Sequence, residues 1–482
     1  THTERDGTKR RYDVYGRLFA LEDRNGSRLV FTYDPGGKLP LSGVSLHQLD
    51  PNTPQVVAYD YRLAKVEERD ASGAPTGRYL QFSYDGSTGR LTSVTDNAGR
   101  TVAYVHDAKG NLSQVTLPDG SQHAYQYQDT NDPHNLTHVD QGQGLYVNTY
   151  NANDRVTRQT HGNHTIDINY QVLYTKTVVT ETTRDEAGNV LHTAATTWEF
   201  DSKGRPVKKT DALGNREITV RDSLMRPTRT ELYEGATLKY AEDRTYDAVG
   251  NTLTKTEASG TPLARTTTYA YNAGNQVTSI TVKSVVNPLQ NKQTVFEYDA
   301  KGNLAKRTET GLLGDGSPYS YVTTYTYTPN GQIASIDGPR TDASDVTSFS
   351  YDAQGRLLSV TQPAGLVTAY SSYTQTGKPQ TVTDPNGVVT SYSYDSLDRV
   401  KTVTIAGDTT AYAYTSSGKI ASITLPKGNA VAYSYDSLGR LSQIKDALGN
   451  SIDYQYDSAG NRVKEEIKDS AGALQKALSF QH

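Results

Sequence analysis

The sequence predicts an all-β protein built as one long array of hairpin repeats. Three observations predict it: a short phrase that recurs about every 21 residues, strand-like alternation between its copies, and a composition poor in apolar residues but rich in tyrosine. A fixed period of this size means one supersecondary unit per repeat, which buries its apolar face only against its neighbours. The repeat therefore overrides the prior of about three domains that the length alone suggests.

The recurring phrase is an aromatic residue, Asp or Asn, two or three variable residues, Gly, then Arg, Asn or Lys. The copies that define it are Tyr12-Asp13 with Gly16-Arg17, Tyr84-Asp85 with Gly89-Arg90, Tyr246-Asp247 with Gly250, Tyr298-Asp299 with Gly302, Tyr351-Asp352 with Gly355-Arg356, Tyr435-Asp436 with Gly439-Arg440 and Tyr456-Asp457 with Gly460. Towards the carboxyl end the aromatics are Tyr351, Tyr373, Tyr394, Tyr414, Tyr435 and Tyr456, so that the steps are 22, 21, 20, 21 and 21 residues.

Each residue of the phrase has an expected structural role. Tyr packs across strands, Asp starts an Asx-turn through its own backbone, and Gly takes the positive φ that closes a hairpin. The aliphatic residue that follows points to the more buried face. Arg lays its stem over a neighbouring Tyr and offers its guanidinium to an Asp of the next repeat. A second turn signal lies about ten residues later, at Asp96, Asp211, Asp384 and Asp446. Each repeat is thus two strands and two turns.

The array is expected to span residues 1–482 as a single unit and to be a fragment of a larger protein. Stretches near 40–80, 129–200 and 283–295 break the period and are interpreted as irregular loops and longer hairpins within the array. No apolar stripe of helical spacing persists for a convincing length, and the best candidate, residues 471–480, is short.

Composition predicts the shape of this sheet. Only 35% of residues are hydrophobic, the mean hydropathy is −0.66, and there are 35 Tyr against 7 Phe and 1 Trp, which is too little for a thick dry core. Tyr suits a sheet that is wet on both sides, because one end of its ring packs while the hydroxyl finds a polar partner. About twenty repeats of two strands make a ribbon roughly 190 Å across its strands. Open sheets of that width curl, so the ribbon must roll into a spiral or shell.

Charge and cysteine content exclude several classes of protein. With 49 Lys and Arg against 53 Asp and Glu, the chain has no basic field for nucleic acid and no polybasic run for a membrane surface. The absence of cysteine excludes a disulfide scaffold and a zinc-thiolate site. Neither a signal peptide nor an apolar segment of membrane-spanning length is visible.

No cofactor, metal site or catalytic residue is predicted. His134 and His138, and His161 and His164, have spacings that a metal can use, but no third ligand or helix aligns them, so surface histidines are preferred. The Asp-x-x-Gly steps match no calcium motif. Nothing selects Glu465-Glu466 as a glycosidase pair, and the Gly-rich residues 311–316 lack the Lys of a phosphate loop. The many Tyr residues could stack on sugars, but cross-strand packing is the preferred explanation for them.

The phrase Tyr-Asp-x-x-Gly-Arg-Leu at this spacing resembles the YD repeat of RHS proteins, the bacterial polymorphic toxins. It is also similar to repeats of toxin-complex C components and of teneurins. The resemblance covers nearly the whole chain. It implies a spiral β-strip that closes into a hollow cocoon, which in bacterial members encloses a carboxyl-terminal toxin until delivery. It also implies a plugging core segment with Asp-dependent self-cleavage, which no segment here matches.

Two functions follow as expectations. The first is a non-catalytic shell around a toxin or other polypeptide cargo, exported by a dedicated secretion system whose components are further possible partners. The second, which the teneurin comparison allows, is an extracellular adhesion or carbohydrate-binding surface. An enzyme is a distant third. The expected location is secreted or cell-surface associated, without nucleic acid or a membrane span.

Overall fold

The computed structural model describes residues 1–4, 6–34, 62–142, 144–171, 175–184, 188–436, 438–457 and 460–480. Within them the chain forms one antiparallel sheet of 40 strands, in which each strand pairs with the strands before and after it in sequence. Two single-turn 3-10 helices, η2 (Pro288–Gln290) and η3 (Pro363–Gly365), are the only helical elements in these residues. The predicted all-β class is confirmed.

The first twenty strands are β1 (His2–Thr3), β2 (Lys9–Tyr12), β3 (Leu18–Glu22), β4 (Arg28–Asp34), β5 (Arg62–Arg69), β6 (Pro75–Tyr84), β7 (Leu91–Asp96), β8 (Thr101–His106), β9 (Leu112–Thr116), β10 (Gln122–Gln126), β11 (His138–Asp140), β12 (Leu145–Tyr150), β13 (Val156–His161), β14 (His164–Gln171), β15 (Lys176–Arg184), β16 (Val190–Phe200), β17 (Pro206–Thr210), β18 (Arg216–Arg221), β19 (Pro227–Glu234) and β20 (Thr237–Tyr246).

The second twenty are β21 (Thr252–Glu257), β22 (Arg265–Tyr271), β23 (Val277–Ser284), β24 (Lys292–Tyr298), β25 (Leu304–Leu312), β26 (Pro318–Tyr327), β27 (Ile333–Asp337), β28 (Thr347–Tyr351), β29 (Leu357–Gln362), β30 (Leu366–Tyr373), β31 (Pro379–Thr383), β32 (Val389–Tyr394), β33 (Val400–Ile405), β34 (Asp408–Tyr414), β35 (Ile420–Thr424), β36 (Ala430–Tyr435), β37 (Leu441–Asp446), β38 (Ser451–Tyr456), β39 (Arg462–Lys468) and β40 (Leu474–Ser479).

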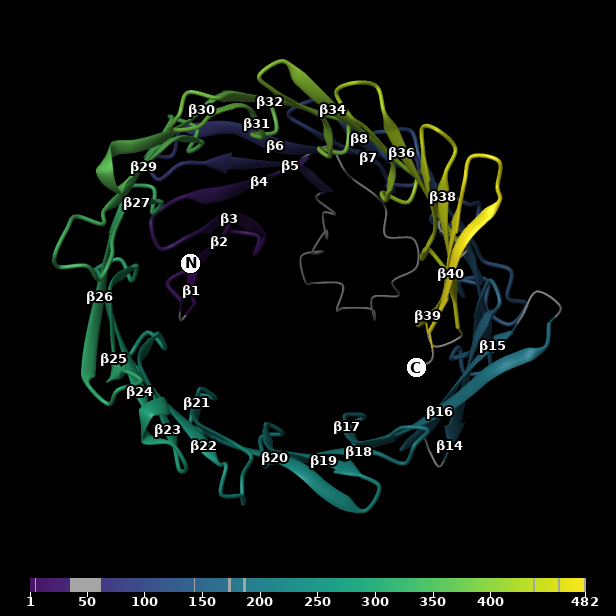
Figure 1. Ribbon diagram of the computed structural model, residues 1–482, viewed down its shortest axis with the longest axis horizontal. Coiled ribbons are helices and arrows are strands. Elements are labelled where there is room, and N and C mark those ends of the chain that lie inside the picture. Colours follow the sequence, from purple (N-terminus) through teal and green to yellow (C-terminus); the bar gives the residue numbers. More distant parts are fainter. Residues whose placement is uncertain are drawn as a thin grey trace, which may run out of the picture.

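The sheet curls into a ring whose last strands lie over its first strands (Figure 1). Strands β1–β8 begin the first coil, the sheet then runs round through β14–β26, and β27–β40 return over the start. From the turn between β24 and β25 onwards, side chains contact residues far earlier in the sequence, as when Asn303 bonds Asn25, 278 positions before it. The chain therefore makes more than one full turn of a spiral, which the sequence predicted from the width of the ribbon.

A bulge at the Tyr of the repeat adds to this curvature. The register shifts between the residue before the aromatic and the aromatic itself at most repeats, including Tyr84, Tyr246, Tyr351 and Tyr435. An extra residue on one strand bends that strand and increases its local right-handed twist. Because the bulge recurs with the repeat, its bends accumulate in one direction and help to roll the ribbon into a coil.

The wall is a single layer with very little dry core. Among the described residues only Ala20, Val115 and Ala241 are buried hydrophobics, and no large side chain is fully buried. Stability must therefore come from ladder hydrogen bonds and from many half-buried side-chain pairs. No helix of the described residues is long and apolar enough to cross a membrane.

Parts of the stretches that break the period form regular strands. Residues 62–69 and 75–84 form β5 and β6, while residues 35–61 lie outside the described residues. Between 138 and 200 the described residues form β11–β16, of which β14–β16 are longer than most strands, and residues 129–137 contain no strand. β12 and β16 end in Tyr150-Asn151 and Phe200-Asp201, which begin turns of the Tyr-Asp kind, whereas β14 and β15 pair without the phrase. The last stretch, 471–480, contains β40 and no helix.

Candidate functional site

The candidate functional site is the wall itself, which is built from the Tyr-Asp turn. In the turn after β28, Asp352 Oδ1 accepts hydrogen bonds from the backbone N–H of Gln354 (3.0 Å) and Arg356 (2.8 Å). The Gly355 N–H donates to the Asp352 carbonyl (3.0 Å) and Gly355 has φ +75°. This is a three-residue hairpin loop that ends in a left-handed residue, the position where glycine carries no steric cost.

The other copies of the phrase occupy the same kind of turn. The glycines at positive φ, between +72° and +101°, are Gly16, Gly89, Gly250, Gly302, Gly355, Gly439 and Gly460. The carboxylates that accept backbone N–H groups of their own turn are those of Asp13, Asp85, Asp247, Asp299, Asp352, Asp436 and Asp457. Tyr12 ends β2 and is 42% exposed.

The Arg of the phrase joins two repeats, but not in the way the sequence suggested. Arg356 stacks on Tyr373 of the next repeat, with the guanidinium carbon 4.8 Å from the ring centroid, as expected. Its ion pair is with Asp352 of its own turn (Nε to Oδ2, 2.6 Å) and not with the next repeat. The four-residue spacing across the loop places the two groups side by side. Arg17, Arg205, Arg226, Arg399 and Arg440 pair with their own Asp in the same way.

The Tyr hydroxyl supplies a link that sequence reasoning missed. Tyr351 donates its O–H to the carbonyl of Ile333, 2.8 Å away and one repeat earlier. Burial raises the pKa of Tyr351, which keeps the hydroxyl protonated as a donor. Equivalent bonds of 2.7–2.9 Å are made by Tyr84, Tyr246, Tyr298, Tyr327, Tyr435 and Tyr456. The excess of Tyr over Phe in the sequence indicates this link, since only Tyr has a hydroxyl to donate.

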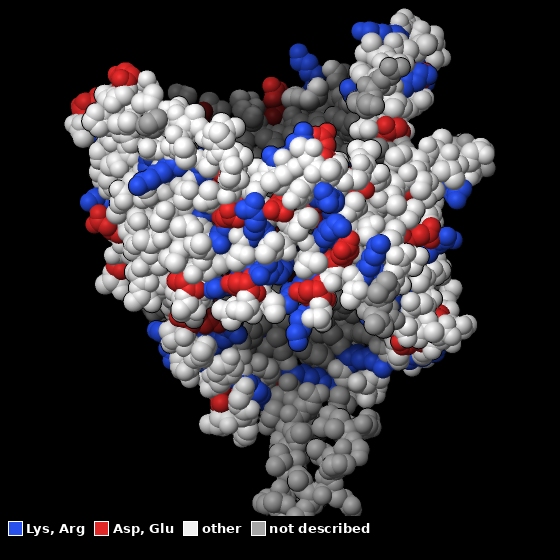
Figure 2. Space-filling model, turned by 90° about the horizontal axis from the view of Figure 1, so that it is seen from below, with Lys and Arg blue, Asp and Glu red and all other residues white. Residues whose placement is uncertain are grey.

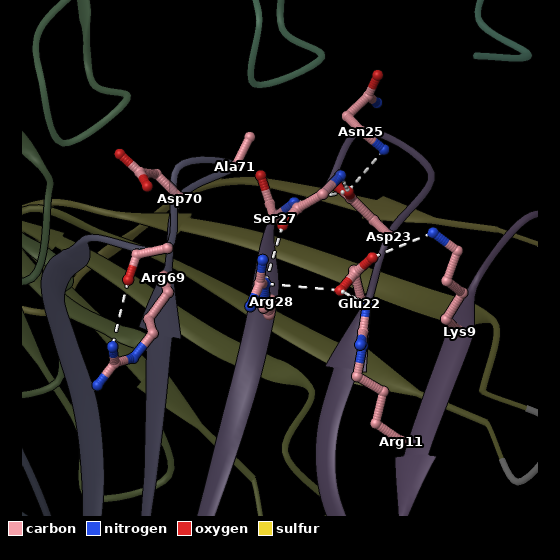
Figure 3. Close-up of polar contacts among 12 residues, drawn as sticks. Lys9, Arg11, Glu22, Asp23, Asn25, Ser27, Arg28, Arg69, Asp70 and Ala71 are labelled. Atoms are coloured by element: carbon pink, nitrogen blue, oxygen red, sulfur yellow. Dashed lines mark hydrogen bonds and ion pairs between the residues drawn. The ribbon is translucent and has the colours of Figure 1, made fainter. Parts of the chain in front are cut away.

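Charged side chains form ladders across neighbouring strands (Figure 3). Glu22 on β3 is only 4% exposed and makes ion pairs with Lys9 (3.2 Å), Arg11 (2.7 Å) and Arg28 (3.5 Å). Burial alone would raise the pKa of Glu22, but hydrogen bonds from Lys9 and Arg11 outweigh it and hold the pKa below its ordinary value. On the face in Figure 2, acidic and basic side chains are interspersed without a large patch of one sign. That face is unlike a nucleic-acid surface.

The two coils meet along a line of side-chain contacts that we call the seam. The second turns of the early repeats meet turns of the Tyr-Asp kind one coil later, and Figure 3 shows Asn25 and Ala71 at the tips of their second turns. The seam contacts are Arg24 to the Gly302 carbonyl, Asn25 with Asn303 (3.0 and 3.2 Å), the Ala71 N–H to Asn330 (3.2 Å), Asn97 to the Gln375 carbonyl (2.7 Å), Arg100 with Asp398 (2.8 Å) and Asp119 with Arg399 (3.2 Å).

The histidines lie apart from any metal-like cluster in the described residues. The His161 ring stacks on Tyr146, with centroids 3.9 Å apart, and His164 faces Thr183 across strands. His134 contacts Asn111 and His138 contacts Thr137. No group of three or more His, Cys, Asp or Glu side chains in this part of the chain has a geometry that could hold a metal ion. The shifted pKa values belong to ion pairs, turn carboxylates and partly buried tyrosines of the wall.

Comparison with known protein families agrees with this geometry. The family described as teneurin YD-shell matches residues 317–471, and the RHS repeat family matches residues 84–122. The chain carries RHS and YD-shell repeats. Both matched stretches lie within the continuous sheet, one in each coil, so the repeat predicted from Tyr-Asp and Gly spacing is confirmed.

Solved structures show the same YD-shell fold. The crystal structure of TcdB2-TccC3 matches with a TM-score of 0.61 and 14% identity, over 99% of this chain and 32% of that one. TcdB2-TccC3-Cdc42 matches with a TM-score of 0.61 and 15% identity, over 94% and 27%. TcdB2-TccC3 without its hypervariable C-terminal region matches with 0.59 and 15%, over 97% and 26%. The YD-repeat chain thus spans about a third or less of the chains it resembles.

Proposed function

We propose that this YD-repeat chain is a non-catalytic wall that encloses a polypeptide cargo, such as a toxin, for delivery by a bacterial secretion system. The observation that carries the proposal is the coiled sheet whose second coil stacks on the first through the seam. A wall of this kind separates an inside from an outside, and the motif residues serve as its joints. The resemblance to TccC3-containing structures supports the proposal through the shared fold.

The size of one coil limits what it can hold. A full turn runs from the β3–β4 turn to the β24–β25 turn, which takes in the 21 strands β4 to β24. At ~4.8 Å per strand that is a contour of about 100 Å, or a ring about 32 Å across. Strand tilt of ~40° would widen it to about 40 Å. Side chains occupy about 10 Å of that width.

The remaining width of roughly 20–30 Å is narrow for a folded domain. A 100-residue domain has a radius of gyration of about 13 Å and needs about 34 Å as a sphere. The cargo that fits one coil is therefore an extended or incompletely folded chain. This makes the state of the cargo a measurable consequence of the proposal.

Adhesion through carbohydrate stacking is less well supported. Sugar binding needs free aromatic faces, but many motif Tyr rings are covered by a cation of the preceding repeat. Such pairs are Arg17 on Tyr33, Arg226 on Tyr246, Arg356 on Tyr373, Arg399 on Tyr414, Lys419 on Tyr435 and Arg440 on Tyr456.

The test is protease protection of a cargo fused after residue 482. Enclosure predicts that the cargo is digested at least tenfold more slowly than the same cargo alone, and that protection ends when the wall is denatured. Digestion at the same rate as free cargo, together with specific binding on a glycan array, would replace enclosure by adhesion.

A further inference from the structure

The glycine of the Tyr-Asp turn is replaced at four positions of the described chain. Asp154, Met225, Asn275 and Asp398 take its place, with φ between +56° and +70°. A side chain in this left-handed region is strained, so it persists where something nearby compensates or requires it. Asn275 accepts a hydrogen bond from Asn251 of the preceding repeat, and Asp154 accepts one from Asn135. Those two contacts stay within one coil.

Asp398 differs because it reaches the other coil. Its Oδ2 lies 2.8 Å from Arg100 Nη1, on the second turn of an early repeat, and its Oδ1 accepts the hydroxyl of Thr376 (2.9 Å). The carboxylate is 21% exposed and the guanidinium 27%. A glycine here would fit the backbone better but would leave Arg100 without its partner across the seam.

The next residue completes a second pair. Arg399 Nη2 lies 3.2 Å from Asp119 Oδ2, on the following second turn of the first coil. The dipeptide Asp398-Arg399 thus presents one negative and one positive group to a positive and a negative group on two successive turns. A shift of the coils by one repeat would break both pairs. The order of the negative and positive residues therefore fixes which repeat of the second coil lies against which repeat of the first.

The rest of the seam is held by weaker contacts. Asn25 with Asn303, Ala71 with Asn330 and Asn97 with Gln375 are neutral hydrogen bonds, and Arg24 adds one charged hydrogen bond to the Gly302 carbonyl but no ion pair. Between described residues, Arg100–Asp398 and Asp119–Arg399 are the only ion pairs that join the coils. Within each coil, by contrast, continuous backbone ladders hold the wall together. The seam is the weaker of the two, so it is where the wall can open.

We propose that Asp398 and Arg399 form an ionic latch that fixes the second coil on the first, and that the shell opens by parting at this seam while its strand ladders remain intact. The latch rests only on the coiled fold. Its use in releasing cargo rests on the enclosing function proposed above.

The test replaces Asp398 by the residue that the repeat normally has. Asp398→Gly relieves the backbone strain and removes the latch carboxylate, so folding is not put at risk. Asp398→Asn keeps a residue that tolerates positive φ and removes only the charge. Met225→Gly is the matched control, because Met225 occupies the same turn position at φ +70° and forms no ion pair across the seam.

The opening of the seam can be measured with spin labels, since the chain has no cysteine of its own. Labels at Ser72→Cys and Ala353→Cys, both exposed turn residues on opposite sides of the seam, report the distance between coils. We expect a single short distance in the parent and in Met225→Gly. We expect a shift to a longer, broader distribution in Asp398→Gly and Asp398→Asn, while far-UV circular dichroism stays unchanged. Raising salt from ~0.01 to ~1 M shortens the screening length from ~30 to ~3 Å and should open the parent and its control by more than the Asp398 variants, in which only the Asp119–Arg399 pair is left to screen.

An unchanged distance in both Asp398 variants would overturn the latch, whatever the cargo does. Protease protection of a fused cargo, measured in the same variants, addresses the enclosing function separately. A parted seam with loss of protection supports both proposals. A parted seam with a cargo that was never protected supports the latch and overturns enclosure.

Discussion

The role of the Asp in the Tyr-Asp turn can be tested against substitutions that other turns of the same chain already carry. Three turns carry Thr where Asp352 stands, namely Thr328, Thr374 and Thr415, and each hydroxyl accepts one backbone N–H at 3.0–3.2 Å. None of them is followed by Arg at the position of Arg356; the residue is Gln or Lys. In these three turns Arg is absent together with the carboxylate, whereas the turn at Asn151 keeps Arg155 without one.

The magnitudes follow from the bonds that are lost. Asp352→Ala removes two backbone hydrogen bonds, at about 1 kcal/mol each, and a half-exposed ion pair worth less than about 1 kcal/mol, giving about 2–3 kcal/mol. Asp352→Thr keeps one backbone bond and should cost about 1–2 kcal/mol. Adding Arg356→Lys should cost almost nothing in the Thr background but about 0.5–1 kcal/mol in the parent, because the guanidinium has no carboxylate left to bind.

Hydrogen exchange of the Arg356 amide is the appropriate assay, since repeat arrays need not unfold in two states. Exchange through local opening should be about 30- to 100-fold faster in Asp352→Ala, and less accelerated in Asp352→Thr. Asp342→Ala, which removes a carboxylate that is 73% exposed, is the control and should change nothing. Equal exchange rates in Asp352→Ala and Asp352→Thr would refute this account of the turn. Additive effects of Asp352→Thr and Arg356→Lys in the double variant would also refute it.

Three further perturbations test other joints of the wall. Tyr351→Phe should destabilise its hairpin by about 0.5–1.5 kcal/mol, because the Ile333 carbonyl loses its hydrogen-bond donor. The measurement is local hydrogen exchange, with Tyr15→Phe as the exposed control. If Tyr351→Phe accelerated exchange less than Tyr15→Phe does, the hydroxyl link would be refuted. Gly439→Val should lower the melting temperature more than Arg440→Lys, because a β-branched residue resists φ +75°; the opposite order would contradict it. For Asp96, Asp352 and Asp395, burial opposes ionisation, but hydrogen bonds from their Arg partners leave each pKa below its ordinary value. Their contribution is complete above the unfolded pKa of about 3.9 and is lost as pH falls through the lower folded values, so the melting temperature should stay level from pH 7 to about 5 and fall below about 4.

The local units of this fold were predictable from sequence because they depend on local chemistry. Asp-x-x-Gly fixes a turn through one side chain and one backbone conformation, as at Asp352 and Gly355. The number of turns then predicted the width of the ribbon, and that width predicted that the sheet curls. The pairings of β15 with β14 and with β16 could not be predicted from the phrase, because they follow from the neighbouring ladders.

The contacts between repeats were less accessible to sequence reasoning. Arg356 was correctly expected on the next Tyr but its ion pair was assigned to the wrong repeat, since the pattern does not tell which of two nearby carboxylates faces the guanidinium. The seam depends on how many strands complete one coil, which is a sum of many small bends. Asp398 was nevertheless visible as a departure from Gly, and that departure marks the place where two distant turns meet.

A crosslink between residues far apart in sequence tests the coil most directly. Asn25 and Asn303 bond each other side chain to side chain, so Asn25→Cys with Asn303→Cys should be joined within one monomer by a short bismaleimide. The pair Asn25→Cys with Asn251→Cys, whose second partner lies on a part of the ring away from β3, should not crosslink. Quantitative joining of the first pair alone is the predicted result. Failure of that pair in folded protein, or equal joining of both pairs, would contradict a sheet that winds back onto its own beginning.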